Sequence, residues 1–212
     1  GIESVDAEAE LALVIGREAR NVPREEASGY IAGFMAFNDV SARKSQKEDG
    51  QWFRAKSFDT FAPCGPWIVT PDEIGDPGNL RVIQRLNGNV MQSGSTSLLI
   101  HDIPSIIAYI TEGMTLMPGD IISTGTPAGV GVFRDPPVFL KEGDTVEVEI
   151  GRLACDMEGS YGQLAKGSPG AVDKGRWQKH MLSWPSVVIG GGTPNIQRNV
   201  IAERILGLPH DA

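Results

Sequence analysis

Three carboxylate side chains have the type and spacing for metal chemistry. Glu8 and Glu10 lie at the start of an apolar run, and Asp39 follows 29 residues after Glu10. In an extended strand, residues i and i+2 point to the same face, roughly 7 Å apart. Like charges that converge on a partly buried face repel one another unless one is protonated or a cation lies between them.

These carboxylates therefore predict a site for a divalent cation. Three oxygen anions that converge from two segments suit a hard ion such as Mg²⁺ or Mn²⁺. We expect the ligands to be Glu8, Glu10 and Asp39. The alternative is an exposed strand that begins with two solvated glutamates.

The elements that must position these residues are two strands. Residues 10–15 form an apolar run that predicts a buried strand, and a second strand over about 35–41 would carry Asp39. Between them, Pro23 is predicted to open a helix. Its apolar stripe follows the i, i+3, i+4, i+7 spacing at Ala27, Tyr30, Ile31 and Phe34.

The rest of the first 150 residues indicates a β-rich α+β domain with mixed sheets, because short strands alternate with long loops. The further predicted elements are strands at 65–70, 80–86, 120–123 and 144–150, a hairpin turn at Asn87-Gly88, a short helix from Pro104 to about Glu112, and loops at 44–51 and 124–131.

The composition limits the classes of partner. The net charge is −8, which disfavours nucleic acid and anionic membranes, because both attract basic patches. The two cysteines, Cys64 and Cys155, form neither a disulfide framework nor a zinc motif, so a reducing, cytoplasmic setting is expected. No apolar run approaches 18 residues, and we expect no membrane span.

The sequence resembles the fumarylacetoacetate hydrolase family over about residues 3–153. The resemblance rests on several motifs that occur in the family's order. They are ELALVIG, YIAGFMAFNDVSAR, Gln46, WFRAKSFDTFAPCGPWIVT, the Asn87-Gly88 turn and PGDIISTGTPAGVG.

The resemblance implies a role for each of seven residues. Those matching the family's metal ligands are Glu8, Glu10 and Asp39; those matching its substrate-binding residues are Arg43, Gln46, Lys56 and Thr126, of which Lys56 is also the catalytic candidate. A lysine cation near the metal would stabilise an enolate, and an arginine can bind a carboxylate through its planar fork. Taken singly, these residues have ordinary alternatives: a surface ion pair for Arg43, a snorkelling side chain for Lys56 and turn chemistry for Thr126.

The resemblance also implies an activity. A metal would polarise a 2-oxo or 1,3-dicarbonyl acid, and the reaction would be C–C hydrolysis, decarboxylation or keto–enol isomerisation. The expected enzyme is a cytoplasmic homodimer that acts on small carboxylic acids in aromatic-compound catabolism. The family's histidine–glutamate base comes from an upstream segment, which this sequence is expected to lack; His101, His180 and His210 do not match it.

The last part of the chain has a different character. Residues 155–212 begin with a Gly-, Ser- and Pro-rich linker, and GGGTPNIQRNVIAERILGLP resembles the C-terminal end of acyl-CoA dehydrogenases, over about residues 158–209. We expect a catalytic domain at 1–154 and a linker with a helical tail at 155–212. Two alternatives remain: a fragment of a flavin-dependent acyl-CoA dehydrogenase, or a non-catalytic fusion remnant.

Overall fold

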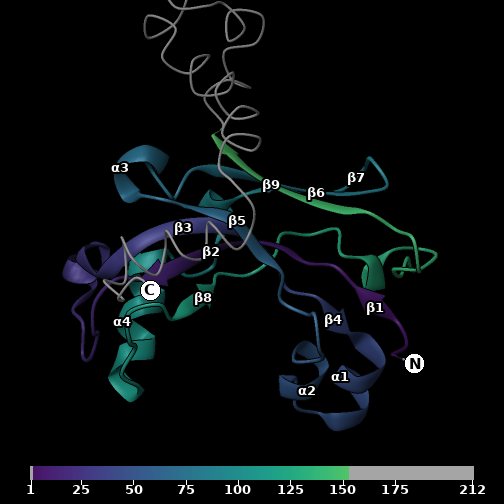
Figure 1. Ribbon diagram of the computed structural model, residues 1–212, viewed down its shortest axis with the longest axis horizontal. Helices are drawn as coiled ribbons and strands as arrows, with labels where there is room; N and C mark the ends of the chain where they lie inside the picture. Colours follow the sequence, from purple (N-terminus) through teal and green to yellow (C-terminus); the bar gives the residue numbers. More distant parts are fainter. Residues whose placement is uncertain (1, 153–212) are drawn as a thin grey trace, which may run out of the picture. The chain divides into compact units, whose positions relative to one another are not determined.

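The computed structural model describes residues 2–152, and Gly1–Ile150 form one compact unit (Figure 1). The predicted linker and helical tail at 155–212 lie outside the described residues, and the predicted boundary stays a prediction. Within the described part, no helix is long and apolar enough to cross a membrane.

A four-stranded antiparallel sheet forms the centre of this unit. Its strands run in the order β5-β3-β2-β8. Their bounds are β2 Ala9–Ile15, β3 Ile31–Asn38, β5 Cys64–Val69 and β8 Ile121–Ser123. Every residue of β2 is buried, because β2 has a neighbour on both edges and its apolar side chains pack in hydrophobic clusters, Leu11, Leu13 and Ile15 in one and Ala12 and Val14 in another. The strands predicted at 10–15, 65–70 and 120–123 are thereby confirmed.

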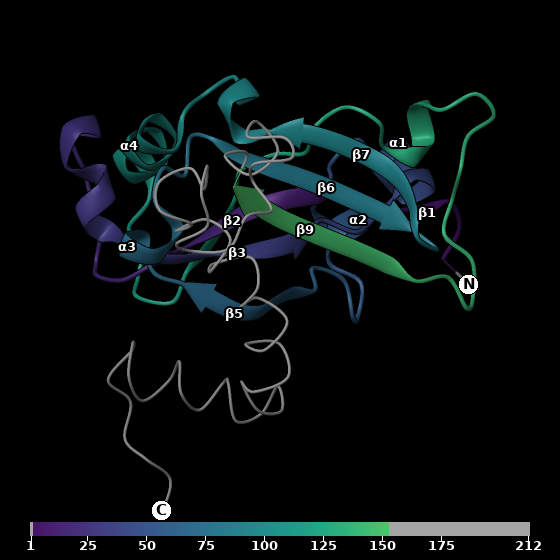
Figure 2. The same ribbon diagram turned by 90° about the horizontal axis from the view of Figure 1, so that it is seen from above.

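A second, three-stranded sheet lies across the first (Figures 1 and 2). Its order is β7-β6-β9, with bounds β6 Leu80–Leu86, β7 Asn89–Ser95 and β9 Val146–Arg152. Leu80 of β6 joins Leu11, Leu13 and Phe34 in the main hydrophobic core. The predicted hairpin is confirmed: Asn87 and Gly88 both have positive φ, as a tight two-residue turn requires.

Within residues 2–152, helices are few and short. The longest, α4 Ile103–Gly113, confirms the predicted helix from Pro104, and the Asp102 side chain caps it by accepting from Ser105 N at 2.9 Å. The α+β fold class is therefore confirmed. The remaining elements are β1 Val5–Asp6, β4 Ser41–Ala42, α1 Arg43–Asp49, α2 Phe53–Lys56, α3 Pro71–Ile74 and the 3₁₀ turns η1 Arg24–Tyr30, η2 Thr96–Leu98 and η3 Gly131–Phe133.

The predicted helix from Pro23 is only partly right. A 3₁₀ turn, η1, occupies its first half, and β3 begins at Ile31. Ile31 and Phe34 pair with Ile15 and Leu13 of β2. Pairing with a distant strand therefore overrides the local helical spacing, which cannot by itself separate a buried strand from a helix.

The loop predicted at 44–51 is wrong. The segment forms α1, which has no buried residue and ends at Gly50 in the left-handed conformation, φ 67°. The glycine marks a helix C-terminus here, because a residue without a Cβ ends a helix at little steric cost. The polar composition reflects an exposed helix.

The approach of β3 to β5 depends on Gly33. A Cβ at this position would lie 2.3 Å from Ile68 Cγ2 and 2.6 Å from Val69 O. We expect Gly33→Ala to lower the free energy of unfolding by about 1–3 kcal/mol, because overpacking forces neighbouring groups apart. Urea unfolding measures this change. The matched control is Gly113→Ala at the end of α4, where no heavy atom lies within 4 Å; an equal loss in both variants would contradict the explanation.

Candidate metal centre

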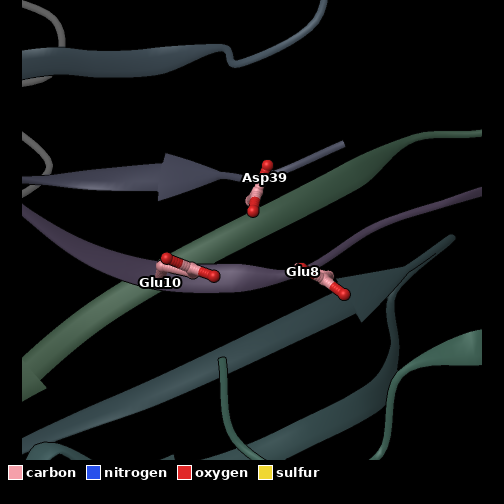
Figure 3. A group of neighbouring side chains, drawn as sticks. All are labelled: Glu8, Glu10 and Asp39. Carbon is pink, nitrogen blue, oxygen red and sulfur yellow. The ribbon is translucent and has the colours of Figure 1, made fainter. Parts of the chain in front are cut away.

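The pairing of β2 with β3 brings the three predicted metal ligands together. Glu8 directly precedes β2, Glu10 lies within it, and Asp39 directly follows β3 (Figure 3). Asp39 N donates to Glu8 O at 2.9 Å. Each carboxylate contributes one oxygen to a group in which all oxygens lie within 4.8 Å of one another. Glu8 and Glu10 are buried, at 8% and 3% exposure.

Glu10 is the most strongly perturbed of these carboxylates. Burial raises the pKa of Glu10 to about 7, and the negative charges of Asp39 and Glu8 add to the rise. The Gly125 N–H, which donates to Glu10 Oε2 at 2.9 Å, and the Ser123 side chain oppose it. Near neutral pH, Glu10 is therefore poised between its protonated and ionised forms.

The Lys56 ammonium lies between two of the carboxylates. Lys56 Nζ donates to Glu8 Oε2 at 3.0 Å and to Asp39 Oδ2. Burial alone would lower the pKa of Lys56, but its hydrogen bonds and ion pairs with Asp39 and Glu8 raise it. Burial raises the pKa of Asp39, and Lys56 counteracts part of that rise. The structure thus places the predicted catalytic lysine against the predicted metal ligands.

Arg43 and Gln46 lie beside Glu8, on α1. Arg43 donates from Nε and Nη2 to Asp6 Oδ2, at 3.0 and 2.8 Å, and from Nη2 to Glu8 Oε1 at 2.5 Å. Its Nη1 donates to Gln46 Oε1 at 3.1 Å. Protein oxygens therefore accept from four of the five guanidinium N–H groups, and the planar fork faces Asp6.

Thr126 lies in the glycine-rich loop that crosses the start of β2. Its hydroxyl donates to Ala9 O at 2.9 Å and accepts from Gln92 Nε2 at 2.8 Å. To donate to a substrate carboxylate, Thr126 would have to release Ala9. The substrate-binding roles of Arg43, Gln46 and Thr126 stay predictions.

Two important residues escaped the sequence analysis. Asp6 is buried and binds Arg43, and Gln92 is fully buried in β7. Gln92 accepts from Ala9 N at 2.9 Å and donates to Thr126 Oγ1 and Pro127 O, so it joins the second sheet to the site. Asp6 could have been predicted, because it continues the i, i+2 spacing of Glu8 and Glu10. For Gln92, no local signal exists, because its partners lie far away in the sequence.

The charges of the site fit a divalent cation. Four carboxylates and two cations gather there: Asp6, Glu8, Glu10, Asp39, Arg43 and Lys56. When all are ionised, the excess is two negative charges, which one Mg²⁺ or Mn²⁺ would balance. Carboxylate oxygens are also the donors that these hard ions prefer. The Lys56 ammonium neutralises part of the negative charge of Glu8 and Asp39.

A separate hollow of about 1140 Å³ lies between the glycine-rich loop and α4. Its lining includes Ser123 and Gly125, which hydrogen-bond Glu10, and His101, but none of the three clustered carboxylates. Leu98, Ile100 and Tyr109 give it an apolar and exposed side.

Comparison with known proteins identifies relatives of the chain. The family model for the fumarylacetoacetate (FAA) hydrolase C-terminal domain matches residues 1–164. A human protein named oxaloacetate tautomerase FAHD2A, mitochondrial, is 48% identical over 153 residues, which are 71% of this chain and 49% of that protein. The chain spans about half the length of such curated relatives.

Solved structures give the same fold. A 5-carboxymethyl-2-hydroxymuconate delta-isomerase from Mycobacterium smegmatis is 46% identical with a TM-score of 0.65, covering 70% of this chain and 55% of that chain. A fumarylacetoacetate hydrolase from Exiguobacterium antarcticum is 47% identical with a TM-score of 0.68, covering 70% and 53%. The comparisons do not support the expected likeness of residues 158–209 to acyl-CoA dehydrogenases, and those residues lie outside the described ones.

The pKa of Glu10 makes stability depend on pH. Folding raises this pKa from 4.5 to about 7, so the folded metal-free chain binds more protons than the unfolded chain between these values. The free energy of unfolding should therefore fall as pH rises through this window, by about 3 kcal/mol from Glu10. Glu10→Gln should remove this part of the fall. Urea unfolding in EDTA at several pH values tests it; an equal fall in both proteins would contradict the assignment.

Proposed function

We propose that this chain, which belongs to the fumarylacetoacetate hydrolase family, is a divalent-metal enzyme that acts on 2-oxo or 1,3-dicarbonyl acids. The observation that carries the proposal is the cluster of Glu8, Glu10 and Asp39, in which the Lys56 ammonium pairs with Glu8 and Asp39. Burying like charges together is costly, and it is useful where a cation must be held. The metal would be Mg²⁺ or Mn²⁺.

Among the family's reactions, keto–enol isomerisation of a 2-oxo acid fits the described residues best. C–C hydrolysis needs a base that activates a water molecule as the nucleophile, whereas isomerisation needs only a base that takes a proton from the carbon next to the carbonyl and a donor that protonates the oxygen. His101 is the one histidine in residues 2–152, and it lines the separate hollow. The names of the human relative, a tautomerase, and of the M. smegmatis protein, an isomerase, support this choice. Hydrolysis and decarboxylation remain the alternatives.

The proposed roles follow from position and charge. Glu8, Glu10 and Asp39 would hold the ion, which as a Lewis acid favours negative charge on a bound carbonyl oxygen. Lys56 would donate a hydrogen bond to that oxygen while a general base removes the proton from the neighbouring carbon, because its ammonium already faces the cluster. Arg43 has one N–H group without an acceptor among the described residues, so it would contribute a single bond to a substrate carboxylate.

The wider setting is also a proposal. A chain with a net charge of −8 can bind a small acidic substrate only where local cations attract it, and Lys56 and Arg43 are such cations. The same net charge gives no basis for nucleic acid binding. The exposed apolar side chains of Leu98, Ile100 and Tyr109 support a homodimer. The cytoplasm and a role in aromatic-compound catabolism stay predictions, and the name of the human relative places that protein in mitochondria.

Metal binding is tested by thermal unfolding with and without Mg²⁺ or Mn²⁺. A ligand that binds the folded state alone stabilises it, by about 2.7 kcal/mol at a hundredfold excess over Kd. We expect a metal-dependent rise in Tm that Asp39→Asn abolishes. The matched control is Asp49→Asn, an exposed aspartate paired with Arg54. An unchanged rise in the Asp39 variant would overturn the ligand assignment.

The role of Lys56 is tested by the ultraviolet absorbance of enol oxaloacetate during its conversion to the keto form. Lys56→Met should lower kcat at least about 100-fold, because a charge-stabilising donor is lost. Mn²⁺ should still bind, since the competing ammonium is gone. Lys44→Met is the control, because Lys44 is exposed and pairs with Glu3. Products of C–C cleavage from an acylpyruvate, without isomerisation, would instead favour the hydrolase alternative.

A further inference from the structure

Behind the metal ligands lies a buried line of three charges, Asp6, Arg43 and Glu8, called here the Asp6–Arg43–Glu8 triad. The side chains are 4%, 11% and 11% exposed, respectively. Arg43 bridges the two carboxylates with Nη2, at 2.8 Å from Asp6 Oδ2 and 2.5 Å from Glu8 Oε1. Buried charges of this kind are retained only with well-made partners, because each has lost its hydration.

Asp6 is itself fixed by the backbone of η3. Gly131 N donates to Oδ1 at 2.9 Å, and Val132 N donates to Oδ2 at 3.0 Å. A Cβ on Gly131 would lie 2.6 Å from Asp6 Oδ1 and 1.9 Å from Val138 O, so only glycine permits this approach. Ala7 N also donates to Oδ1, at 2.9 Å, so three backbone amides and Arg43 together hold the carboxylate of Asp6.

The geometry gives the two oxygens of Glu8 different tasks. Oε1 accepts from Arg43, and Oε2 accepts from Lys56, which also contacts Asp39. Oε2 therefore faces the other predicted metal ligands, while Oε1 is tied to the triad. Groups that orient a metal ligand from outside the coordination sphere typically change metal affinity 10–100-fold when they are lost.

We propose that Asp6 and Arg43 are positioning residues that hold Glu8 with Oε2 toward the metal. The inference rests on the proposed metal site, and assigns Arg43 a task besides substrate binding. A simple electrostatic view makes the opposite forecast for Arg43: a cation near the site repels Mn²⁺, so its removal would tighten binding, and its replacement by lysine would change little. The two explanations are therefore separable by experiment.

The test measures the Mn²⁺ dissociation constant of the full chain by calorimetry and by the electron paramagnetic resonance signal of free Mn²⁺. Arg43→Lys keeps the charge but cannot bridge Asp6 and Glu8 with a planar fork. We expect its Kd to rise about 10-fold or more. Asp6→Asn should act in the same direction, because an amide would place a donor against either Arg43 or the Gly131 and Val132 amides.

One control residue, Lys44, lies on α1 beside Arg43, and the other, Glu3, lies in the segment before β2 that also contains Asp6. Lys44→Arg and Glu3→Gln alter an exposed ion pair of 2.9 Å, and their Kd should match the unaltered chain. The metal-free Tm is recorded for each variant, because a merely structural role would lower Tm and leave the affinity of the folded protein unchanged. Arg43→Lys is expected to fold even where Asp6→Asn does not, because lysine keeps a positive charge beside the carboxylates of Asp6 and Glu8.

Each outcome decides one question. Weaker Mn²⁺ binding by Arg43→Lys, with unchanged controls, supports the positioning role. A second outcome is that the unaltered chain binds Mn²⁺, the Glu10→Gln variant does not, and Arg43→Lys binds Mn²⁺ as tightly as the unaltered chain or more tightly. That outcome overturns the positioning role and leaves the proposed function standing. Absence of Mn²⁺ binding by the unaltered chain overturns both.

Discussion

The structure around the candidate site depends on one constraint, the burial of several carboxylates at the junction of β2 and β3. Glu8 and Glu10 are almost inaccessible to water, and Asp39 lies within 4.8 Å of them through its carboxylate. Such a cluster is unfavourable unless cations and hydrogen-bond donors surround it. Arg43 and Lys56 supply the cations, from two short helices that otherwise bury little.

Backbone amides of the glycine-rich loop supply the rest of the compensation. Gly125 N donates to Glu10, and Gly131 N donates to Asp6. The two glycines are required for different reasons: Gly125 has a φ of 107°, which side chains rarely allow, and a Cβ on Gly131 would lie 1.9 Å from Val138 O. Gln92 then fastens the loop to the start of β2, so the second sheet also serves the site.

The sequence predicted the elements whose signals are local and missed those that depend on distant partners. The three clustered carboxylates were found because their spacing along two strands already implies convergence. The predicted strand over about 35–41 begins too late, because the first residues of β3, from Ile31, have an apolar spacing typical of a helix but pair with β2. Asp6 bonds Arg43, 37 positions away, and Gln92 bonds Ala9 and Thr126, 83 and 34 positions away, so no local pattern reveals these partners. The roles of Arg43, Gln46 and Thr126 came from resemblance alone and stay predictions.

The two cations are not equivalent, and this difference bears on how the site would work. Arg43 contacts the outer oxygen of Glu8 and is tied to Asp6, so it can stay in place when an ion binds. Lys56 occupies the space between Glu8 and Asp39, where an ion would compete with it. If these carboxylates hold an ion, the ion would neutralise them in place of Lys56, and the N–H groups of Lys56 would be available to a substrate oxygen. The same side chain would then serve both as a counter-charge for the carboxylates and as a hydrogen-bond donor to the substrate.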